Sequence, residues 1–165
     1  MNKFSKVSFE QYLRDFDISL EGVDVNKTYD EIILPKRSTK GSAGYDFFAP
    51  FDFIIHPNET FKVPTGIKCQ IDSRWFLGIF IRSSLGFKYQ INIVNQTGII
   101  DEDYFNNENN EGHIMIKLVN RGSGIVAIKK GCGIAQGIFL PYGLTVDDYS
   151  KNERTGGIGS TDRKV

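Results

Sequence analysis

The sequence has little cysteine, and the two cysteines that it has stand far apart. Cys69 and Cys132 belong to no CxxC pair and to no cluster with histidine, which argues against both a zinc knuckle and a disulfide framework. The HxE and PCxxC ligands of zinc-dependent deaminases are missing as well, so that class of enzyme is excluded. Such cysteine usage fits a reducing compartment, and we expect a cytoplasmic protein.

The sequence also lacks a net charge and a long apolar run. Its 20 basic residues balance its 20 acidic residues, so no overall field draws the protein to nucleic acid or to an anionic membrane, and a polyanion site must be built locally. The N-terminus has no apolar core of signal-peptide length, and no window approaches the ~20 apolar residues of a membrane-spanning helix. We therefore expect neither nucleic acid nor a membrane as a partner.

The strongest positive signal is a strand-like alternation of apolar and polar residues. A chain of 165 residues fits one domain that hides roughly 70% of its unfolded surface. After Pro35 the alternation has the period of half-buried strands, at Phe61 and Val63, at Ile67, Cys69 and Ile71, and at Ile114, Ile116 and Leu118. Glycine interrupts these runs at short intervals, which favours a sandwich over alternating strands and helices. We predict an all-β domain, a distorted jelly roll or β-sandwich, over residues 34–150.

Residues 1–33 are predicted to form an N-terminal extension with one short helix. Ser8 and Gln11 match a capping box. A helix over residues 8–16 would carry one apolar face, made by Phe9, Leu13 and Phe16. We expect this helix to be a peripheral addition to the β domain.

Two polar segments are predicted to lie outside the strands. Residues 106–112, NNENNEG, contain no apolar side chain and should form a loop. Residues 147–165 are polar and glycine-rich, and we expect this tail to be mobile on its own. Within it, residues 151–165 are predicted to be a C-terminal arm.

Five short segments carry residue types that phosphate chemistry needs: GSAGYD at 41–46, RSSLG at 82–86, GIIDEDY at 98–104, GCGIAQ at 131–136 and RTGGIGST at 154–161. Any one of them alone is more typical of a turn at a strand end. In this order and spacing they resemble the five signature motifs of the trimeric dUTPase family, and the similarity runs from about Leu34 to Thr161. Asn95 and the run Val119–Gly122 extend the resemblance between the motifs.

The resemblance implies a homotrimeric, magnesium-dependent enzyme that cleaves dUTP to dUMP and pyrophosphate. Such an enzyme keeps uracil out of DNA and supplies dUMP for thymidylate synthesis. The resemblance also implies that each site combines segments from different subunits, with the fifth motif closing a site built mainly by its neighbours. The sequence has no carboxylate cluster with metal-ligand spacing, which agrees with Mg²⁺ held chiefly by the triphosphate and by water.

The second motif supplies groups that suit a phosphate chain. Triphosphate hydrolysis needs charge neutralisation, an oriented water, a base and a pocket for the nucleoside. Arg82, Ser83 and Ser84 place a guanidinium and two hydroxyls in one short turn, and charge-assisted hydrogen bonds contribute roughly 1.5 to 3 kcal/mol each. The resemblance adds Gln136 as a phosphate contact, and Asp46 as a residue that orders Arg82 and, through water, the metal.

The third motif supplies the base. Asp101 follows the apolar pair Ile99 and Ile100, where a strand would end and direct a carboxylate into a site. The resemblance assigns this residue to deprotonate the water that attacks the α-phosphorus, and loss of such a base costs about 10²- to 10⁴-fold in rate. Glu102 and Asp103 are interpreted as surface charges, because the family pattern assigns catalysis to the first position.

The nucleoside contacts are also assigned by resemblance. Tyr104 would pack on the deoxyribose and leave no space for a ribose 2′-hydroxyl. Asn95 would read uracil, because an amide offers both the donor and the acceptor that O4 and N3–H require. Backbone groups near Gly98 and Met115 would complete that edge, and Ile100 is included among the substrate-binding residues.

The fourth and fifth motifs depart from the family pattern. In the fifth, Arg154 would neutralise the γ-phosphate, and three small residues would wrap around it, namely Gly156, Gly157 and Ser160. Ile158 stands where the family has an aromatic residue, which predicts a weaker lid over the uracil. In the fourth motif Gly133 replaces the usual basic residue, which puts a local salt bridge in doubt.

Two alternatives from other functional classes stay open. A dCTP deaminase-like enzyme shares this fold and a similar Arg-Ser turn, but the position that would hold its catalytic glutamate is Lys117, which cannot do that chemistry. A nucleotide-sensing regulatory protein would keep the fold and bind a protein partner through the N-terminal helix, the Asn-rich loop or the tail. The intact Asp101 argues against a purely regulatory role, because a binding module needs no base.

Overall fold

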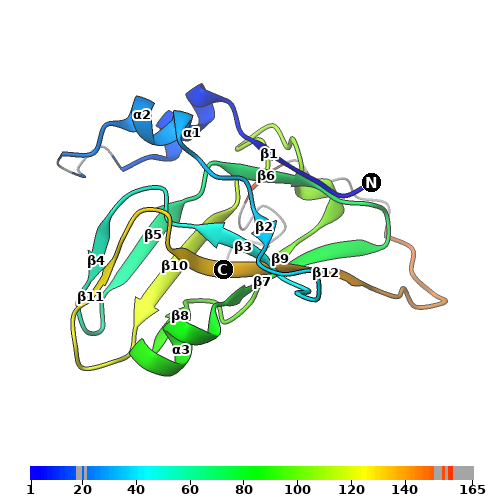
Figure 1. The fold of residues 1–165 in the computed structure, drawn as a ribbon. Coiled ribbons are helices and arrows are strands. Elements are labelled where there is room, and N and C mark those ends of the chain that lie inside the picture. The colour runs from blue at the N-terminus through cyan, green and yellow to red at the C-terminus, as the bar shows by residue number, and fades with distance from the viewer. Residues whose placement is uncertain (18–19, 21, 151–153, 155, 158–165) are drawn as a thin grey trace, which may run out of the picture.

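The computed structural model describes residues 1–17, 20, 22–150, 154 and 156–157 of the chain (Figure 1). In this part of the chain, strands predominate and the helices are short. The elements in chain order are β1 (Lys3–Lys6), α1 (Phe9–Asp15), α2 (Val25–Asp30), β2 (Lys36–Arg37), β3 (Tyr45–Phe48), β4 (Phe53–Ile55), β5 (Thr60–Pro64), β6 (Ile67–Gln70), β7 (Trp75–Ile81), α3 (Ser83–Tyr89), β8 (Ile91–Ile93), β9 (Gly98–Ile100), the 3₁₀ helix η1 (Glu102–Tyr104), β10 (Met115–Asn120), β11 (Val126–Ile128) and β12 (Gly133–Pro141). None of the helices in the described residues is long and apolar enough to cross a membrane.

The strands of the described residues form antiparallel sheets. The largest has the order β2-β3-β12-β7-β9, the next has the order β5-β10-β8, and β1-β6 and β11-β4 are two-stranded. In Figure 1, α1 and α2 lie together at one edge of the molecule, and α3 lies at the opposite edge. The predicted all-β class is confirmed, and the strands predicted around Val63, Cys69 and Ile116 are β5, β6 and β10.

The pairing of β7 with β9 places Asp101 of the third motif far from Arg82 of the second motif. Leu77 pairs with Ile100, and Ile79 pairs with Gly98. Asp101 therefore follows β9 beside the start of β7, whereas Arg82 follows the other end of β7. About six residues of β7 separate these two levels, and at about 3.3 Å per residue they span roughly 20 Å.

The hydrophobic core includes the N-terminal segment. Fully buried side chains of the β domain include Phe47, Val63, Leu77, Ile116 and Ile134. Val7, Tyr12 and Phe16 belong to the same cluster, and burial of such side chains contributes roughly 1.5 to 3 kcal/mol each. The expectation of a peripheral helix is therefore wrong, because α1 covers part of the core.

Helix α1 has the predicted N-cap, and Phe16 is buried as predicted, but the buried face departs from the predicted one at Leu13. The hydroxyl of Ser8 accepts a hydrogen bond from the N–H of Gln11 at 3.1 Å, as in a capping box. The amide of Ser8, however, donates to Glu111 at 3.0 Å. Tyr12 is fully buried, whereas Leu13 is 41% exposed. The helix is thus rotated so that Tyr12 takes the buried place predicted for Leu13.

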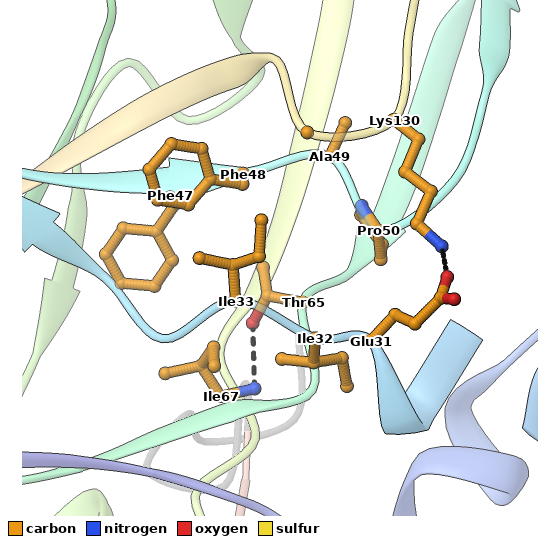
Figure 2. Close-up of a pocket in the computed structure, with 11 residues that line it drawn as sticks. Glu31, Ile32, Ile33, Phe47, Phe48, Ala49, Pro50, Thr65, Ile67 and Lys130 are labelled. Carbon is orange, nitrogen blue, oxygen red and sulfur yellow. Dashed lines mark hydrogen bonds and ion pairs between the residues drawn. The ribbon is translucent and has the colours of Figure 1, made fainter. Parts of the chain in front are cut away.

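Helix α2, which the sequence reading did not predict, leads into a segment that packs on β3 (Figure 2). Its cap is Asp24, whose side chain accepts a hydrogen bond from the N–H of Lys27 at 3.1 Å. Just after the helix, Glu31 forms an ion pair with Lys130. The cavity beside this pair holds about 20 Å³, which is room for a water molecule and not for a nucleotide.

Candidate active site

Arg82 and Asp46 form the centre of a first cluster. Arg82 occupies the N-cap position of α3, so the second motif begins a helix and is more than a turn. Nη1 of Arg82 lies 2.6 Å from Oδ2 of Asp46, and the same oxygen accepts a hydrogen bond from the hydroxyl of Ser38 at 2.5 Å. Gln136 pairs with Asp46 across β12 and β3. The structure therefore brings three predicted site residues together: Asp46, Arg82 and Gln136.

This first cluster is suited to binding an anion. The side chain of Asp46 is 9% exposed and that of Arg82 is 35% exposed. Ser83 and Gln136 line a surface cavity of about 430 Å³ beside them, and Ser84 is exposed in the first turn of α3. A nearly buried carboxylate thus holds one nitrogen of the guanidinium. Its other N–H groups make no hydrogen bond within the described part of the chain, which leaves them available as donors there.

Gly133 gives Arg82 the space that it occupies. A Cβ atom at residue 133 would lie 2.6 Å from Nη1 of Arg82 and 2.9 Å from its Cδ, closer than real contacts allow. The sequence put a local salt bridge in doubt at this position. In the structure, the guanidinium fills the space beside Gly133 and makes its salt bridge with Asp46.

Asp101 belongs to a second cluster. Its side chain is 48% exposed, and Oδ2 lies 2.8 Å from Nη2 of Arg154. Burial raises the pKa of Asp101, the charge of Arg154 lowers it, and the neighbouring acids Asp103 and Glu102 raise it, so that the pKa stands above its ordinary value. A raised pKa suits a carboxylate that has to accept a proton.

Arg154 also forms an ion pair with Asp103, which was interpreted from sequence as a surface charge. Its Nε lies 2.9 Å from Oδ1 of Asp103, and its guanidinium lies 5.6 Å from the ring centroid of Tyr104. Asp103 is exposed, as a surface charge should be, and it is also a partner of Arg154. Glu102 accepts a hydrogen bond from the backbone of Arg74 at 3.1 Å.

A pocket of about 490 Å³ lies beside β10, and the predicted uracil-reading residues line it. Asn95 and Met115 contribute to its wall together with Asp15, Asn109, Asn110 and Lys117. The volume falls in the range of small-molecule sites, roughly 300 to 1,000 Å³. Gly98 and Ile100 lie in β9, and both are partly buried.

Tyr104 is held by two hydrogen bonds and is 6% exposed. Its hydroxyl donates to the carbonyl of His113 at 3.0 Å and accepts from Nδ2 of Asn110 at 2.8 Å. Burial raises the pKa of Tyr104. Because Asn110 also lines the pocket, the 106–112 loop connects this tyrosine to the predicted nucleoside site.

The described part of the fifth motif lies against the same loop. Gly156 and Gly157 are buried, and a Cβ atom at Gly157 would lie 3.1 Å from Nδ2 of Asn110. The two other assignments in this motif, Ser160 and Ile158, lie outside the described residues, as does most of the arm predicted to be mobile.

Sequence reasoning missed the residues that support the site from behind. Ser38 donates a hydrogen bond to Asp46. His113 accepts one from Tyr104 through its carbonyl and contacts Asp15 through its side chain. The contact between Asp15 and His113 joins residues 98 positions apart, so no local pattern could show it. The 106–112 loop gave one usable signal, because a run of asparagines offers many side-chain donors and acceptors.

The described residues contain no group of three or more histidine, cysteine or acidic side chains that could hold a metal ion. Two predicted site residues carry carboxylates, Asp46 and Asp101, and each forms an ion pair with an arginine. This donor set fits a hydrated ion such as Mg²⁺ that is bound mainly by substrate phosphates, since this ion keeps several of its waters.

The cluster of Arg82 and Asp46, the pocket beside β10 and the carboxylate of Asp101 suit the binding and hydrolysis of a small anionic substrate. The dUTPase family model matches residues 30–162. The deoxyuridine 5′-triphosphate nucleotidohydrolase of Lactococcus lactis is 38% identical over 148 residues, which cover 87% of this chain and 99% of that protein. The corresponding protein of Tolumonas auensis is 38% identical over 142 residues, which cover 81% of this chain and 90% of that protein.

Solved structures agree with this result. The crystal structure of dUTPase from Streptococcus mutans has a TM-score of 0.67 and 33% sequence identity, and the match covers 88% of this chain and 98% of that one. A dUTPase from phage phi11 of S. aureus has a TM-score of 0.65 at 18% identity and supports the fold alone, over 92% of this chain and 97% of that one.

The chain belongs to the dUTPase family. The predicted jelly-roll fold and the predicted enzyme class, a dUTP diphosphatase, are thereby confirmed. Members of this family are nucleotide hydrolases that generally depend on a metal. Neither the deaminase nor the purely regulatory alternative is favoured by these relatives.

Proposed function

We propose that this chain converts dUTP to dUMP and pyrophosphate through attack of water on the α-phosphorus, with Asp101 as the base. The single observation that carries the assignment of the base is the environment of Asp101, which has a raised pKa and stands beside Tyr104 and Arg154. Membership of the dUTPase family supports dUTP as the substrate. The product would supply thymidylate synthesis, and removal of dUTP would keep uracil out of DNA.

The nucleoside would occupy the pocket of about 490 Å³. There the amide of Asn95 would read the uracil edge with backbone groups near Gly98 and Met115, and Ile100 would border the base. The ring of Tyr104, fixed by two hydrogen bonds, would exclude a ribose 2′-hydroxyl by shape.

The phosphates would bind the first cluster and the arm. Arg82 would donate charge-assisted hydrogen bonds, with further contacts from Ser83, Ser84 and Gln136. Arg154, now on Asp101 and Asp103, would move to the γ-phosphate, with backbone N–H groups of the glycine-rich arm and the hydroxyl of Ser160. We propose Mg²⁺ as the metal, which would neutralise charge on the triphosphate and reach Asp46 through water.

Each site would combine segments of different subunits in a homotrimer. The roughly 20 Å that the β-strand rise places between the levels of Arg82 and Asp101 is too far for one triphosphate to contact both in a single chain. A second subunit that supplies the Arg82 cluster removes this conflict. Arg154 contacts Asp101 of its own chain, so Arg82, and not Arg154, is the residue that would have to come from another subunit.

The remaining partners and the location belong to the same proposal. The enzyme would work in the cytoplasm on a free nucleotide, without nucleic acid or a membrane as a partner. A regulatory protein that binds the N-terminal helix, the Asn-rich loop or the tail would be compatible with catalysis.

The test is magnesium-dependent release of pyrophosphate from dUTP, dCTP, dTTP and UTP, by the wild type and by Asp101→Asn. We expect rapid release from dUTP alone and a loss of about 10²- to 10⁴-fold in the variant. A uracil product from dCTP would support the deaminase alternative. Binding of dUTP without turnover would support a regulatory protein.

A further inference from the structure

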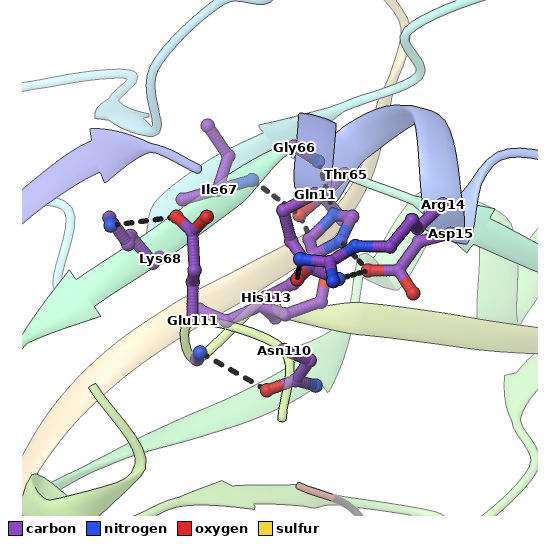
Figure 3. A network of polar contacts seen from close by, with 12 residues as sticks. Gln11, Arg14, Asp15, Thr65, Gly66, Ile67, Lys68, Asn110, Glu111 and His113 are labelled. Carbon is purple, nitrogen blue, oxygen red and sulfur yellow. Dashed lines mark hydrogen bonds and ion pairs between the residues drawn. The ribbon is translucent and has the colours of Figure 1, made fainter. Parts of the chain in front are cut away.

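A chain of polar contacts joins helix α1 to His113 (Figure 3). The side chain of His113 is 0% exposed, and its Nδ1 lies 2.6 Å from Oδ2 of Asp15. Its Nε2 accepts a hydrogen bond from the amide of Gly66 at 2.7 Å. Because an amide N–H can only donate, Nε2 carries no proton and Nδ1–H must donate to Asp15. The tautomer and the orientation of the ring are both fixed.

The backbone of His113 in turn holds Tyr104. The carbonyl of His113 accepts the hydroxyl of Tyr104 at 3.0 Å. The other contact of that hydroxyl is Nδ2 of Asn110, at 2.8 Å. The position of the buried tyrosine ring therefore depends on the backbone at residue 113, which Asp15 and Gly66 fix through the imidazole.

Asp15 is itself oriented and borders the predicted nucleoside pocket. Nε2 of Gln11 donates to Oδ2 of Asp15 at 2.7 Å. Burial acts to raise the pKa of Asp15, but hydrogen bonds from His113 and Gln11 outweigh it, and the pKa is lowered. The side chain is 21% exposed, and it lines the same pocket as Asn95 and Met115.

We propose that Asp15 is a specificity-determining positioning residue, which acts through His113 to hold Tyr104 against the sugar. This inference rests on the proposed function. Residue 15 precedes the region matched by the family model, which begins at residue 30, so the role belongs to the N-terminal segment of this chain. Helix α1 would thus help to fix the position of the Tyr104 ring, which excludes a ribose 2′-hydroxyl.

The test compares kcat/KM for dUTP with kcat/KM for UTP in two variants of Asp15. Asp15→Ala removes the acceptor of the His113 proton, and we expect the dUTP-to-UTP ratio to fall about tenfold, within the range for rejection of one hydroxyl. Asp15→Asn keeps an oxygen that can accept from Nδ1–H, and we expect its ratio to stay within about twofold of the wild type.

Two further variants separate positioning from a general loss of stability. Glu31→Ala removes a different polar contact between the same N-terminal segment and the β domain, the ion pair with Lys130 (Figure 2). This contact lies away from the residues that line the pocket, and the ratio should not change. Asn110→Ala removes the second hydrogen bond to Tyr104 and should lower the ratio as well, which keeps the proposal testable if Asp15→Ala does not fold.

The outcomes distinguish this inference from the proposed function. A wild-type ratio in folded Asp15→Ala or, if that variant does not fold, in Asn110→Ala would overturn the inference and leave dUTP hydrolysis intact. An equal fall in Glu31→Ala would also overturn it, because loosening of the whole segment would then explain the effect. A wild type that releases no pyrophosphate from dUTP would overturn the proposed function, and this inference with it.

Discussion

At the scale of single residues, Asp101 experiences two opposing influences. Burial raises its pKa, and the guanidinium of Arg154, with Nη2 2.8 Å away, lowers it. The charged oxygens of a triphosphate would compete with Asp101 and Asp103 for the guanidinium of Arg154. Transfer of the arginine to the phosphates would leave the carboxylate free to accept a proton from water.

Removal of Arg154 should move the acid limb of the pH–rate profile. The pH dependence of kcat/KM reports the base of the free enzyme, and Asp101 must be unprotonated to act. Arg154 lowers the pKa of Asp101, so Arg154→Ala should raise that pKa and shift the limb to higher pH by up to about one unit. Arg154→Lys keeps the charge and should shift it less. An unmoved limb in Arg154→Ala would show that this contact does not persist in solution.

At the scale of elements, sequence periodicity predicted strands better than helices. The alternation at β5, β6 and β10 shows which face of each strand is buried, because side chains of a strand point to opposite faces in turn. The face of α1 could not be found in this way. Its buried side is set by contacts with distant segments, such as Tyr29 at 5.6 Å from Tyr12 between ring centroids, and these contacts depend on the fold.

The rotation of α1 gives a stability prediction. The hydroxyl of Tyr12 is buried and has no hydrogen-bond partner among the described residues. Tyr12→Phe removes an unsatisfied polar atom, so we expect a gain of about 1 kcal/mol and a melting temperature about 2 to 4 °C higher. Tyr12→Ala should lose about 3 to 5 kcal/mol. Leu13→Ala, at the residue predicted from sequence to be buried, should stay within about 0.5 kcal/mol of the wild type. Equal losses in both alanine variants would contradict the observed face.

At the scale of the whole molecule, five motifs predicted one site, but a single chain gathers them into two clusters. Asp46, Arg82 and Gln136 come together through β3, β12 and the end of β7. Asp101, Tyr104 and Arg154 come together after β9. The sequence shows which motifs are present. It cannot show the distance between them, because that distance depends on how the strands pair. In the proposed function, assembly joins the two clusters.

Mixing two inactive variants tests this assembly directly. Arg82→Ala disables the first cluster and Asp101→Asn disables the second, and each should be inactive alone. If a site takes Arg82 from one subunit and Asp101 from another, random mixed trimers should carry both intact residues in about one quarter of their sites. We therefore expect dUTP hydrolysis to return after the two variants are co-refolded.

The matched control combines two defects of the same cluster. Arg82→Ala and Gln136→Ala would act in the same part of the site, because Gln136 pairs with Asp46 and Asp46 binds Arg82. Mixed trimers of these two variants can form no site with both residues intact, so their activity should not exceed that of the variants measured separately. If Arg82→Ala and Asp101→Asn also fail to complement while wild type and Asp101→Asn form active mixed trimers, each site lies within one chain. The arm or α3 would then have to move far enough to bring Arg82 and Asp101 to one triphosphate.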